Sequence, residues 1–277
     1  MGKVIAAMLV ILVVGSAYTF VGLGRWFPET IAAHGPAIDA QFRNTLVVVA
    51  IAFTLAQLAL GYAVVRFASG GKESRAVYSH GNDKLELVWT AVTAAVFIIV
   101  AVLGQRVWAS LHLNSAPPDA TKIEVVAQQF QFNFHYSGAD GVFGKTEPRF
   151  IDDSSLNYVG LDPNDAAGKD DLQLTTLIIP ENRPVELTLR SKDVIHSFFV
   201  PALRFKQDTV PGMAIKVHFT ATKTGKYEIP CAELCGQLHY NMKSYMLVVP
   251  GDDYDALSAL SGSQFQERFT ALQQQYQ

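Results

Sequence analysis

The sequence contains few cysteines and few tryptophans, and it lacks the motif that attaches haem covalently. Only Cys231 and Cys235 are cysteines among 277 residues, and none of the three tryptophans follows Trp108. No Cys-x2-Cys-His sequence occurs, which excludes a c-type haem bound covalently to this chain. Two close cysteines in an exported domain could form a disulfide, so their chemistry has to be judged from the residues around them.

The C-terminal part of the chain is short of positive charge. Residues 116–277 carry 20 acidic and 14 basic side chains, whereas residues 1–115 carry 5 and 8, which gives the formal net charge of −3. An acidic region repels phosphates, and this argues against nucleic acid as a partner. The charge suits a basic protein partner, and it fits plain solubility equally well.

Long apolar runs occur only before residue 110. They cover about residues 4–23, 45–67 and 87–108. Each is close to the roughly 20 residues that cross a hydrocarbon core of about 30 Å, and such runs are helical in lipid. We therefore expect residues 1–110 to form a membrane anchor of three helices, and of two at least. The first run also resembles a cleavable signal peptide, because a lysine precedes it and small residues interrupt it, so its retention stays open.

Basic residues in the connecting loops indicate the orientation. The loop after the second run holds four basic residues, and the loop after the first holds two that are offset by two acidic residues. These residues are Arg66, Lys72, Arg75 and Lys84 in the former, and Arg25, Arg43, Glu29 and Asp39 in the latter. Because the more basic loop stays in the cytoplasm, Met1 is expected inside and everything after residue 109 outside. In a bacterium this means the cytoplasmic membrane, with the C-terminal domain on the periplasmic face.

Residues 116–250 alternate between apolar and polar side chains as strands do. The alternating apolar positions are Ile123, Val125 and Ala127; Phe130, Phe132 and Phe134; Val185, Leu187 and Leu189; Ile215, Val217 and Phe219; and Tyr245, Leu247 and Val249. Short strands separated by Pro and Gly predict an antiparallel sandwich or barrel. The phase slips by one residue near Gln128-Gln129, which suggests a bulge or bend. Residues 137–171 are rich in Gly and Asp and are expected to be an exposed insertion, and residues 251–277 a partly helical tail.

The residues that carry chemistry lie in one short stretch. Cys231, Cys235, His239 and Met242 fall within twelve residues. Thiol, imidazole and thioether are soft ligands that favour copper over magnesium or calcium. Zinc competes for thiol and imidazole, but a thioether suits it poorly. Pro230 and Gly236 disfavour one regular helix, so we expect these side chains on a loop.

A fifth ligand is expected from an earlier strand. Copper sites of cupredoxin sandwiches take several ligands from a late loop and one histidine from an earlier strand end, and His196 lies 35 residues before Cys231. Each residue alone has a commoner structural role: a hydrogen-bonded histidine, a disulfide or a core methionine. Together they favour a metal site. A mononuclear blue-copper site needs one thiolate, whereas two thiolates can bridge two copper ions, an arrangement suited to moving electrons.

With these residues identified, the chain resembles subunit II of cytochrome c oxidases from about residue 80 to 250. The similar motifs are Asp193–Phe198 with Val200-Pro201, Asp208 with Val210–Gly212, and Cys231–Met242. The resemblance implies a cupredoxin-like Greek-key sandwich that holds a pair of copper ions, the CuA centre. It assigns side-chain ligands to His196, Cys231, Cys235, His239 and Met242, and a backbone carbonyl ligand to Glu233. The Glu233 carboxylate would also reach a magnesium ion at the border with subunit I.

The anchor carries the same resemblance and one departure from it. His80–Thr90 resembles the start of the second family helix, which puts Glu86 at the mouth of a proton pathway into subunit I. Without the resemblance, the favoured interpretation of Glu86 is an acidic residue that suits the start of a helix. The family strand where electrons arrive from cytochrome c is usually rich in tryptophan, whereas here it begins at Phe130. Phe130 is therefore the candidate for this region, and the donor is left open.

The resemblance implies the electron-accepting subunit of a haem-copper oxidase. Electrons from cytochrome c or another periplasmic donor would pass through the copper pair to a haem in subunit I, where oxygen is reduced and protons are translocated. Its partners would be subunit I, other oxidase subunits, the donor and membrane lipid. The alternatives are the copper subunit of a nitric oxide reductase, against which Glu86 argues mildly, and a membrane-tethered copper carrier. A quinol oxidase subunit is disfavoured, because that branch lacks the copper ligands.

Overall fold

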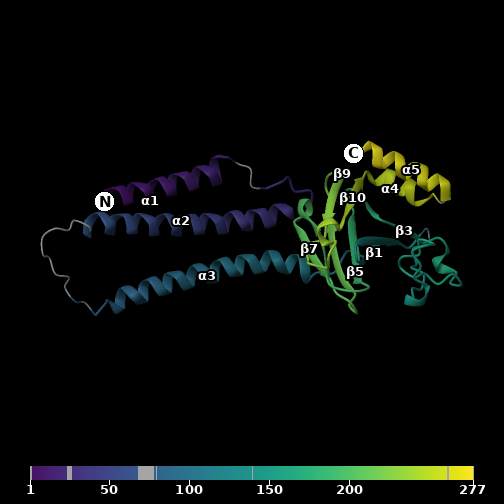
Figure 1. The fold of residues 1–277 in the computed structure, drawn as a ribbon, viewed down its shortest axis with the longest axis horizontal. Coiled ribbons are helices and arrows are strands. Elements are labelled where there is room, and N and C mark those ends of the chain that lie inside the picture. The colour runs from purple at the N-terminus through teal and green to yellow at the C-terminus, as the bar shows by residue number, and fades with distance from the viewer. Residues whose placement is uncertain are drawn as a thin grey trace. The chain divides into compact units, whose positions relative to one another are not determined.

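The chain forms two compact units in a computed structural model (Figure 1). The structure describes residues 2–23, 27–67, 78, 80–138, 140–260 and 262–276. The anchor unit comprises Met1–Pro28 and Ala37–Ala109, and the head unit comprises Glu29–Pro36 and Ser110–Gln277. The basic residues Arg25, Lys72 and Arg75, which were used to orient the chain, lie outside the described residues.

Among the described residues, the anchor contains three helices that are long and apolar enough to cross a membrane. They are α1 (Gly2–Ala17), which continues as a turn of π-helix over Tyr18–Gly22, α2 (Gly35–Phe67) and α3 (Asp83–His112). Both α2 and α3 start before the apolar runs do, because a run marks only the part of a helix that suits lipid. The start of α3 is capped by Asn82, whose side-chain oxygen accepts a hydrogen bond from the Leu85 N–H at 3.1 Å.

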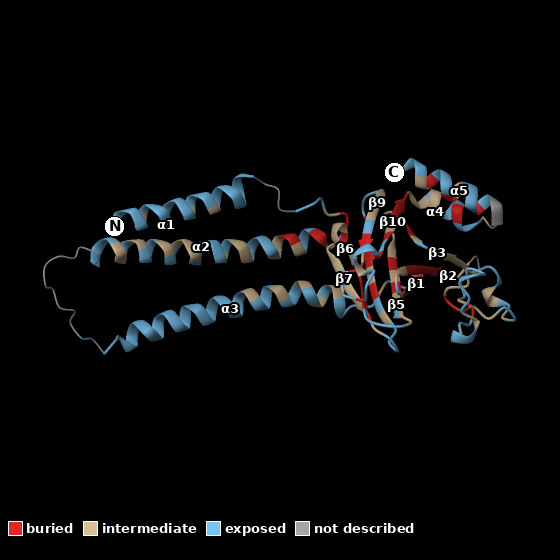
Figure 2. Cartoon of the chain, in the orientation of Figure 1, coloured by how far each residue is buried: buried red, intermediate tan, exposed pale blue. Residues whose placement is uncertain are grey.

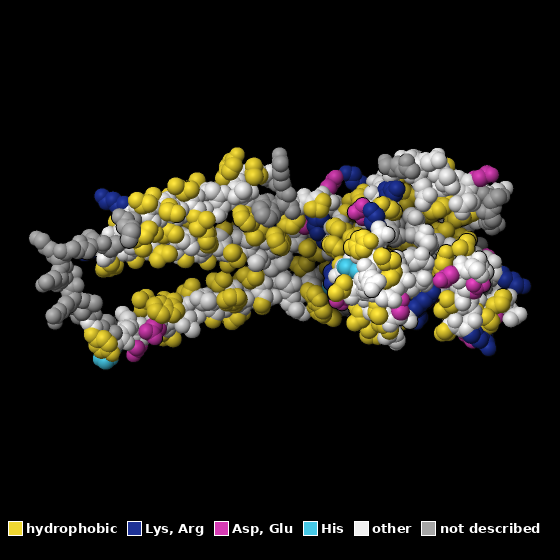
Figure 3. Space-filling view, viewed as in Figure 1, with side chains coloured by type: hydrophobic (Ala, Val, Ile, Leu, Met, Phe, Trp, Pro, Cys, Tyr) yellow, Lys and Arg dark blue, Asp and Glu magenta, His cyan; other side chains and the backbone are white. Residues whose placement is uncertain are grey.

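The helices expose their apolar side chains. None of the residues in the most apolar window of each helix is buried (Figure 2), and hydrophobic side chains dominate the visible surface of the helices (Figure 3). An apolar surface of this extent is stable only when lipid or another protein covers it. Within the anchor, α1 lies against α2 around Gly61, where an added Cβ would lie 3.9 Å from Leu9.

The described residues of the head form three small sheets. The first has the strand order β3-β2-β1-β5-β8, the second β4-β10-β9, and the third pairs β6 with β7. The strands are β1 (Thr121–Gln128), β2 (Gln131–Tyr136), β3 (Leu172–Leu174), β4 (Thr176–Pro180), β5 (Pro184–Ser191), β6 (His196–Val200), β7 (Phe205–Thr209), β8 (Ile215–Thr220), β9 (Gly225–Pro230) and β10 (Lys243–Val249). The pairs β1–β5 and β4–β10 are parallel and the others antiparallel. The first two sheets are therefore mixed, and not purely antiparallel as the sequence predicted. The alternation of apolar and polar residues could not reveal this, because it carries no information about strand direction.

The apolar alternation of the sequence gives one face of each strand to the core. Val125 lies opposite Phe134, and Ala127 opposite Phe132, and all four side chains are buried. The phase slip near Gln128-Gln129 is not a bulge within one strand. It is a tight turn at Gln129-Phe130 that joins two antiparallel strands.

The tail forms two helices, α4 (Gly251–Ser258) and α5 (Gly262–Gln275). They cover the outer face of the β4-β10-β9 sheet and create a second core with it. Its buried members are Ile178, Leu247, Val249, Leu257, Phe265, Phe269 and Leu272. Burial of this face explains the apolar spacing seen near the C-terminus.

The described residues of the insertion 137–171 form no named strand. They form turns, isolated β-bridges and two short 3-10 helices, Pro148–Phe150 and Ala167–Lys169. A buried charged cluster lies at its base. The Nε2 atom of His135 lies 2.6 Å from Asp171 Oδ2, and its Nδ1 atom lies 3.0 Å from Glu124 Oε2. The last residue of the insertion is thereby joined to β1 and β2.

The short segment Glu29–Pro36 belongs to the head, although it lies within the range expected for the anchor. Ile31 and Ala32 are almost fully buried in the main core of the head. The Thr222 N–H donates to the Ile31 carbonyl at 2.7 Å, and the Ala33 N–H donates to the Thr220 carbonyl at 3.0 Å. The segment thus extends the edge of the head beyond β8. Two apolar residues in a polar loop were too weak a signal to predict this.

Candidate metal centre

Strand pairing fixes the loop that carries most of the candidate ligands. Cys231 directly follows β9, and Met242 directly precedes β10. The Cys231 N–H donates to the Met242 carbonyl at 3.0 Å, which closes the base of the loop. The Ala232 N–H donates to the Ser197 carbonyl at 3.1 Å, which holds the loop against the start of β6, where His196 lies.

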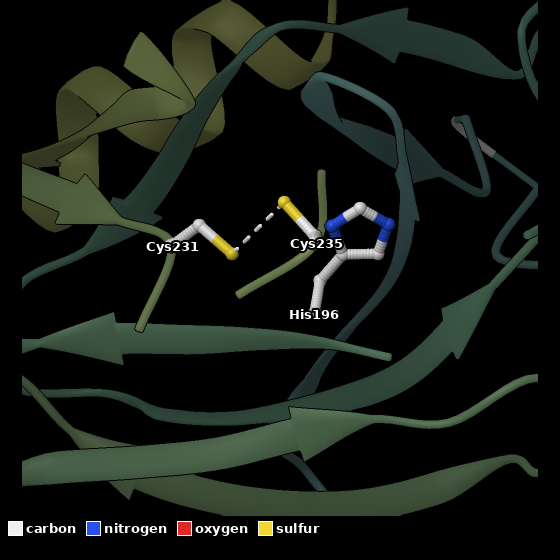
Figure 4. A group of neighbouring side chains, drawn as sticks. All are labelled: His196, Cys231 and Cys235. Atoms are coloured by element: carbon white, nitrogen blue, oxygen red, sulfur yellow. Dashed lines mark hydrogen bonds between the residues drawn. The ribbon is translucent and has the colours of Figure 1, made fainter. Parts of the chain in front are cut away.

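The sulfur atoms of the loop lie close together without being bonded. The two Sγ atoms of Cys231 and Cys235 are 3.9 Å apart and point toward one another (Figure 4). A disulfide would need about 2.05 Å, and both cysteines are free. The Cys235 Sγ atom also lies 3.6 Å from His239 Nδ1 and 3.7 Å from Met242 Sδ.

His196 approaches these thiols from the earlier strand, as the sequence led us to expect. One possible ligand atom from each of His196, Cys231 and Cys235 lies within 4.8 Å of the others. The described part of the chain contains one such group of His, Cys, Asp and Glu side chains. All three residues are buried, as is Met242, so the group is shielded from water.

The two thiols cannot easily carry two negative charges by themselves. Burial alone would raise the pKa of Cys231, but interactions with His196 and with the backbone at Ser197 and Glu233 lower it to about 6. Burial and the adjacent negative charge of Cys231 raise the pKa of Cys235 to about 11. A bound cation would favour the thiolate form of both residues.

The His196 ring has one nitrogen bonded and one available. Its Nε2 atom lies 2.8 Å from Asp193 Oδ1, whereas its buried Nδ1 atom has no hydrogen-bond partner. Burial alone would lower the pKa of His196, but the neighbouring Cys231 and Asp193 raise it. A buried nitrogen without a partner is costly, and a metal ion is the partner that this arrangement fits.

The remaining predicted residues lie at different distances from this group. The Glu233 carbonyl oxygen lies 3.3 Å from Cys231 Sγ, and the Glu233 side chain is half-buried. Phe130 is half-buried and packs against the main core of the head. Glu86 lies in the first turn of α3, where it is exposed, and belongs to the anchor unit.

The sequence alone did not reveal two supporting residues: Asp193, as the partner of His196, and Gln129. Asp193 precedes His196 by three residues, and a nearby acid is a signal that could have been used. Gln129 donates from Nε2 to the Cys235 carbonyl at 2.6 Å across 106 residues of sequence, and no local pattern reveals such a contact.

Comparisons with known proteins decide the family. The family model for the periplasmic domain of cytochrome c oxidase subunit II matches residues 123–249, and the model for its transmembrane domain matches residues 20–107. An alternative cytochrome c oxidase subunit 2 of Bradyrhizobium diazoefficiens is 36% identical over 91% of this chain and 90% of its own length. The chain belongs to the cytochrome c oxidase subunit II family.

Two further similar proteins cover less of this chain. Cytochrome c oxidase subunit 2 of Thermostichus vulcanus is 29% identical over 82% of this chain and 76% of its own. The crystal structure of the periplasmic domain of subunit II from Bradyrhizobium japonicum matches with 24% identity and a TM-score of 0.39, over 55% of this chain and 99% of that one. The transmembrane match begins at residue 20, close to the C-terminal end of the first apolar span, Gly2–Gly22.

The predicted family and fold class are confirmed: three apolar helices precede an all-β, cupredoxin-like head. The chain is a membrane-anchored subunit of a cytochrome c oxidase, an oxidoreductase complex, and its family binds copper. The donor set fits that metal, since thiols, imidazoles and a thioether are the ligands that copper prefers.

Proposed function

We propose that this chain is the electron-accepting subunit of a respiratory haem-copper oxidase. Electrons from cytochrome c or another periplasmic donor would pass through a dinuclear copper centre to a haem in subunit I, where oxygen is reduced to water. The observation that carries the proposal is the pair of free, buried thiols 3.9 Å apart beside the unpartnered Nδ1 of His196. The complex would translocate protons in a bacterial cytoplasmic membrane, with the head on the periplasmic face.

The proposal assigns a ligand role to each residue of the centre. His196, Cys231, Cys235, His239 and Met242 would bind through their side chains, and Glu233 through its backbone carbonyl. The pair of copper ions, when bound, would accept and release single electrons. The chain's own part is to hold these donors in a loop fixed by β9 and β10, where burial excludes water and limits rearrangement.

Three further roles are proposed from the family resemblance. The Glu233 carboxylate would contribute to a magnesium site at the border with subunit I. Glu86 would lie at the mouth of a proton pathway into subunit I, and its exposed position among apolar residues of α3 is compatible with that role. The surface near Phe130 would receive electrons from the donor, because the ring of Phe130 lies beside Gly236 of the ligand loop.

Spectroscopy of the purified, copper-loaded full-length chain tests the proposal. We expect two copper ions per chain and an electron paramagnetic resonance (EPR) signal of one unpaired electron shared by two copper nuclei. A single-copper spectrum, a silent spectrum after mild oxidation, or a disulfide between Cys231 and Cys235 in the metal-loaded complex would contradict it.

The activity of the intact complex then distinguishes an oxidase from a nitric oxide reductase and from a copper carrier. We expect the complex purified through this chain to contain a large haem protein and to consume oxygen with a reduced donor. Turnover of nitric oxide without oxygen consumption would favour the reductase. Rapid exchange of copper with a chelator would favour a carrier, although the buried ligand atoms argue for a closed site.

A further inference from the structure

Gln129 lies in the turn between β1 and β2, outside the ligand loop. It nevertheless forms hydrogen bonds with Cys235 of that loop and with Asp193, the partner of His196. Its side-chain amide donates from Nε2 to the Cys235 carbonyl at 2.6 Å. Its backbone N–H donates to Asp193 Oδ2 at 2.7 Å. One residue therefore contacts the loop that carries the thiols and the carboxylate that holds His196.

The ligand loop accommodates this turn through a glycine. An added Cβ at Gly236 would lie 2.7 Å from Gln129 Nε2 and 3.1 Å from the ring of Phe130. Gly236 also has a φ of +138°, which favours glycine over other residues. Gly236 therefore allows Gln129 and Phe130 to approach the loop closely, because any other residue at this position would clash with them.

The Asp193 carboxylate completes the connection. One of its oxygens accepts from the Gln129 backbone, and the other lies 2.8 Å from His196 Nε2 and accepts from the Val194 N–H at 2.7 Å. With both oxygens engaged, the carboxylate cannot rotate without breaking a bond. The orientation that leaves His196 Nδ1 available is thus fixed partly by the turn.

We propose that Gln129 is a positioning residue for the metal centre, fastening the turn that carries Phe130 to Cys235 and, through Asp193, to His196. This inference rests on the proposed copper function. Groups that orient metal ligands affect metal affinity by about 10- to 100-fold when they are removed. Gln129 contacts a ligand residue only through its backbone carbonyl, so we expect an effect of about tenfold, at the lower end.

The test removes the amide donor while keeping the size of the side chain. In Gln129→Met, the full-length chain in detergent is loaded with copper, and release of copper to excess bathocuproine disulfonate is followed under reducing conditions. We expect release about tenfold faster than in the wild type, with changed copper hyperfine couplings in the EPR spectrum of the oxidised centre. The backbone N–H to Asp193 remains, so copper should still bind.

Matched variants separate positioning from general loosening. Gln237→Met changes an exposed glutamine of the ligand loop itself and should release copper at the wild-type rate. Gln131→Met changes a glutamine of the same hairpin whose amide donates to Asn133, and it should also leave release unchanged. Gln129→Lys, which retains a donor, should recover most of the slow release. Thermal unfolding of the metal-free chain should be the same for Gln129→Met and Gln237→Met.

Each possible result of these experiments either supports or opposes the role of Gln129, or it contradicts the proposed function. The role of Gln129 would be overturned if Gln129→Met released copper within about twofold of the wild-type rate, or if its EPR spectrum were unchanged. It would also be overturned if the metal-free Gln129→Met chain unfolded at a lower temperature than Gln237→Met, because general loosening would then explain the faster release. If Gln129→Met does not fold, Gln129→Lys is decisive, because wild-type release and spectrum support the role and fast release opposes it. A wild-type chain that binds no copper would instead contradict the proposed function.

Discussion

Two fully buried histidines of the head differ in how many of their ring nitrogens have a hydrogen-bond partner. His135 has both nitrogens close to carboxylates, Glu124 at 3.0 Å and Asp171 at 2.6 Å. His196 has only Nε2 so engaged, and its Nδ1 has no hydrogen-bond partner. Residue type and burial therefore do not identify a metal ligand. The decisive property is whether a lone pair remains after the protein's own hydrogen bonds are made.

The two histidines also differ in the atoms that surround them. His135 is flanked by hard oxygen atoms and by the ring of Phe143, whose centroid lies 5.0 Å from its own. Arg190 adds a positive charge 3.3 Å from Glu124. His196 is flanked by soft sulfur atoms. We interpret the first cluster as a structural link that holds the insertion, and the second as a site for a soft metal.

Loss of a thiol should produce the largest effect and tests the assignment of the His196 cluster directly. In Cys231→Ser or Cys235→Ser, the hydroxyl is a poor substitute for a thiolate ligand, so the proposed pair of copper ions should be lost and electron transfer abolished. Metal analysis and EPR of the full-length chain measure this. Retention of two copper ions with a shared unpaired electron in either variant would remove the distinction between the clusters.

Replacement of the other histidine should affect stability and leave copper in place. His135→Leu leaves two carboxylates without their partner in a buried site, which costs about 3–5 kcal/mol of unfolding free energy. Urea unfolding of the full-length chain, followed by circular dichroism, measures the loss. The control is His218→Leu, a partly exposed position on β8. Loss of copper from folded His135→Leu chain would show that the clusters are not independent.

Acid should weaken the His135 cluster through Glu124. Burial alone would raise the pKa of Glu124, but hydrogen bonding and charge from His135, together with Arg190, lower it below the ordinary value of 4.5. A folded-state pKa below the unfolded one gives stability that is present above the ordinary value and is lost as pH falls through the folded value. The urea midpoint of the wild type should therefore fall more steeply than that of Glu124→Gln between about pH 5 and pH 3. Parallel curves would mean that Glu124 gains nothing from His135.

The smallest effect on stability is expected for a solvent-exposed ion pair. Lys216 lies 3.1 Å from Glu186 on the sheet, but its side chain is 67% exposed. Lys216→Met should change the unfolding free energy by less than about 1 kcal/mol, because exposed ion pairs contribute little. The same urea experiment checks this. A loss comparable to that of His135→Leu would show that burial is not what separates the two ion pairs.

Sequence reasoning succeeded where the signal is local. Cys231, Cys235, His239 and Met242 lie within twelve residues, so their shared chemistry is visible without a structure. The apolar runs of the anchor and the alternation of the strands are equally local, since each follows from the period of one element. The ligand roles of the site residues, and the boundaries given to the domains, remain predictions.

What could not be predicted depends on contacts between distant segments. Asp171 meets His135 across 36 residues, and Gln129 meets Cys235 across 106. The parallel pairing of β1 with β5 is likewise a property of the assembled sheet. Polar side chains that form such contacts have no periodicity, so single-sequence reasoning treats them as ordinary surface residues.

The placement of Ile31 and Ala32 in the head core constrains how the protein is made. The loop after the first helix and the head must reach the same aqueous compartment, so the chain between them crosses the bilayer an even number of times, as α2 and α3 allow. The head cannot complete its core until both crossings have been inserted, because its first piece is synthesised some eighty residues before the rest. A head translocated without residues 29–36 would leave uncovered the apolar surface beneath Ile31.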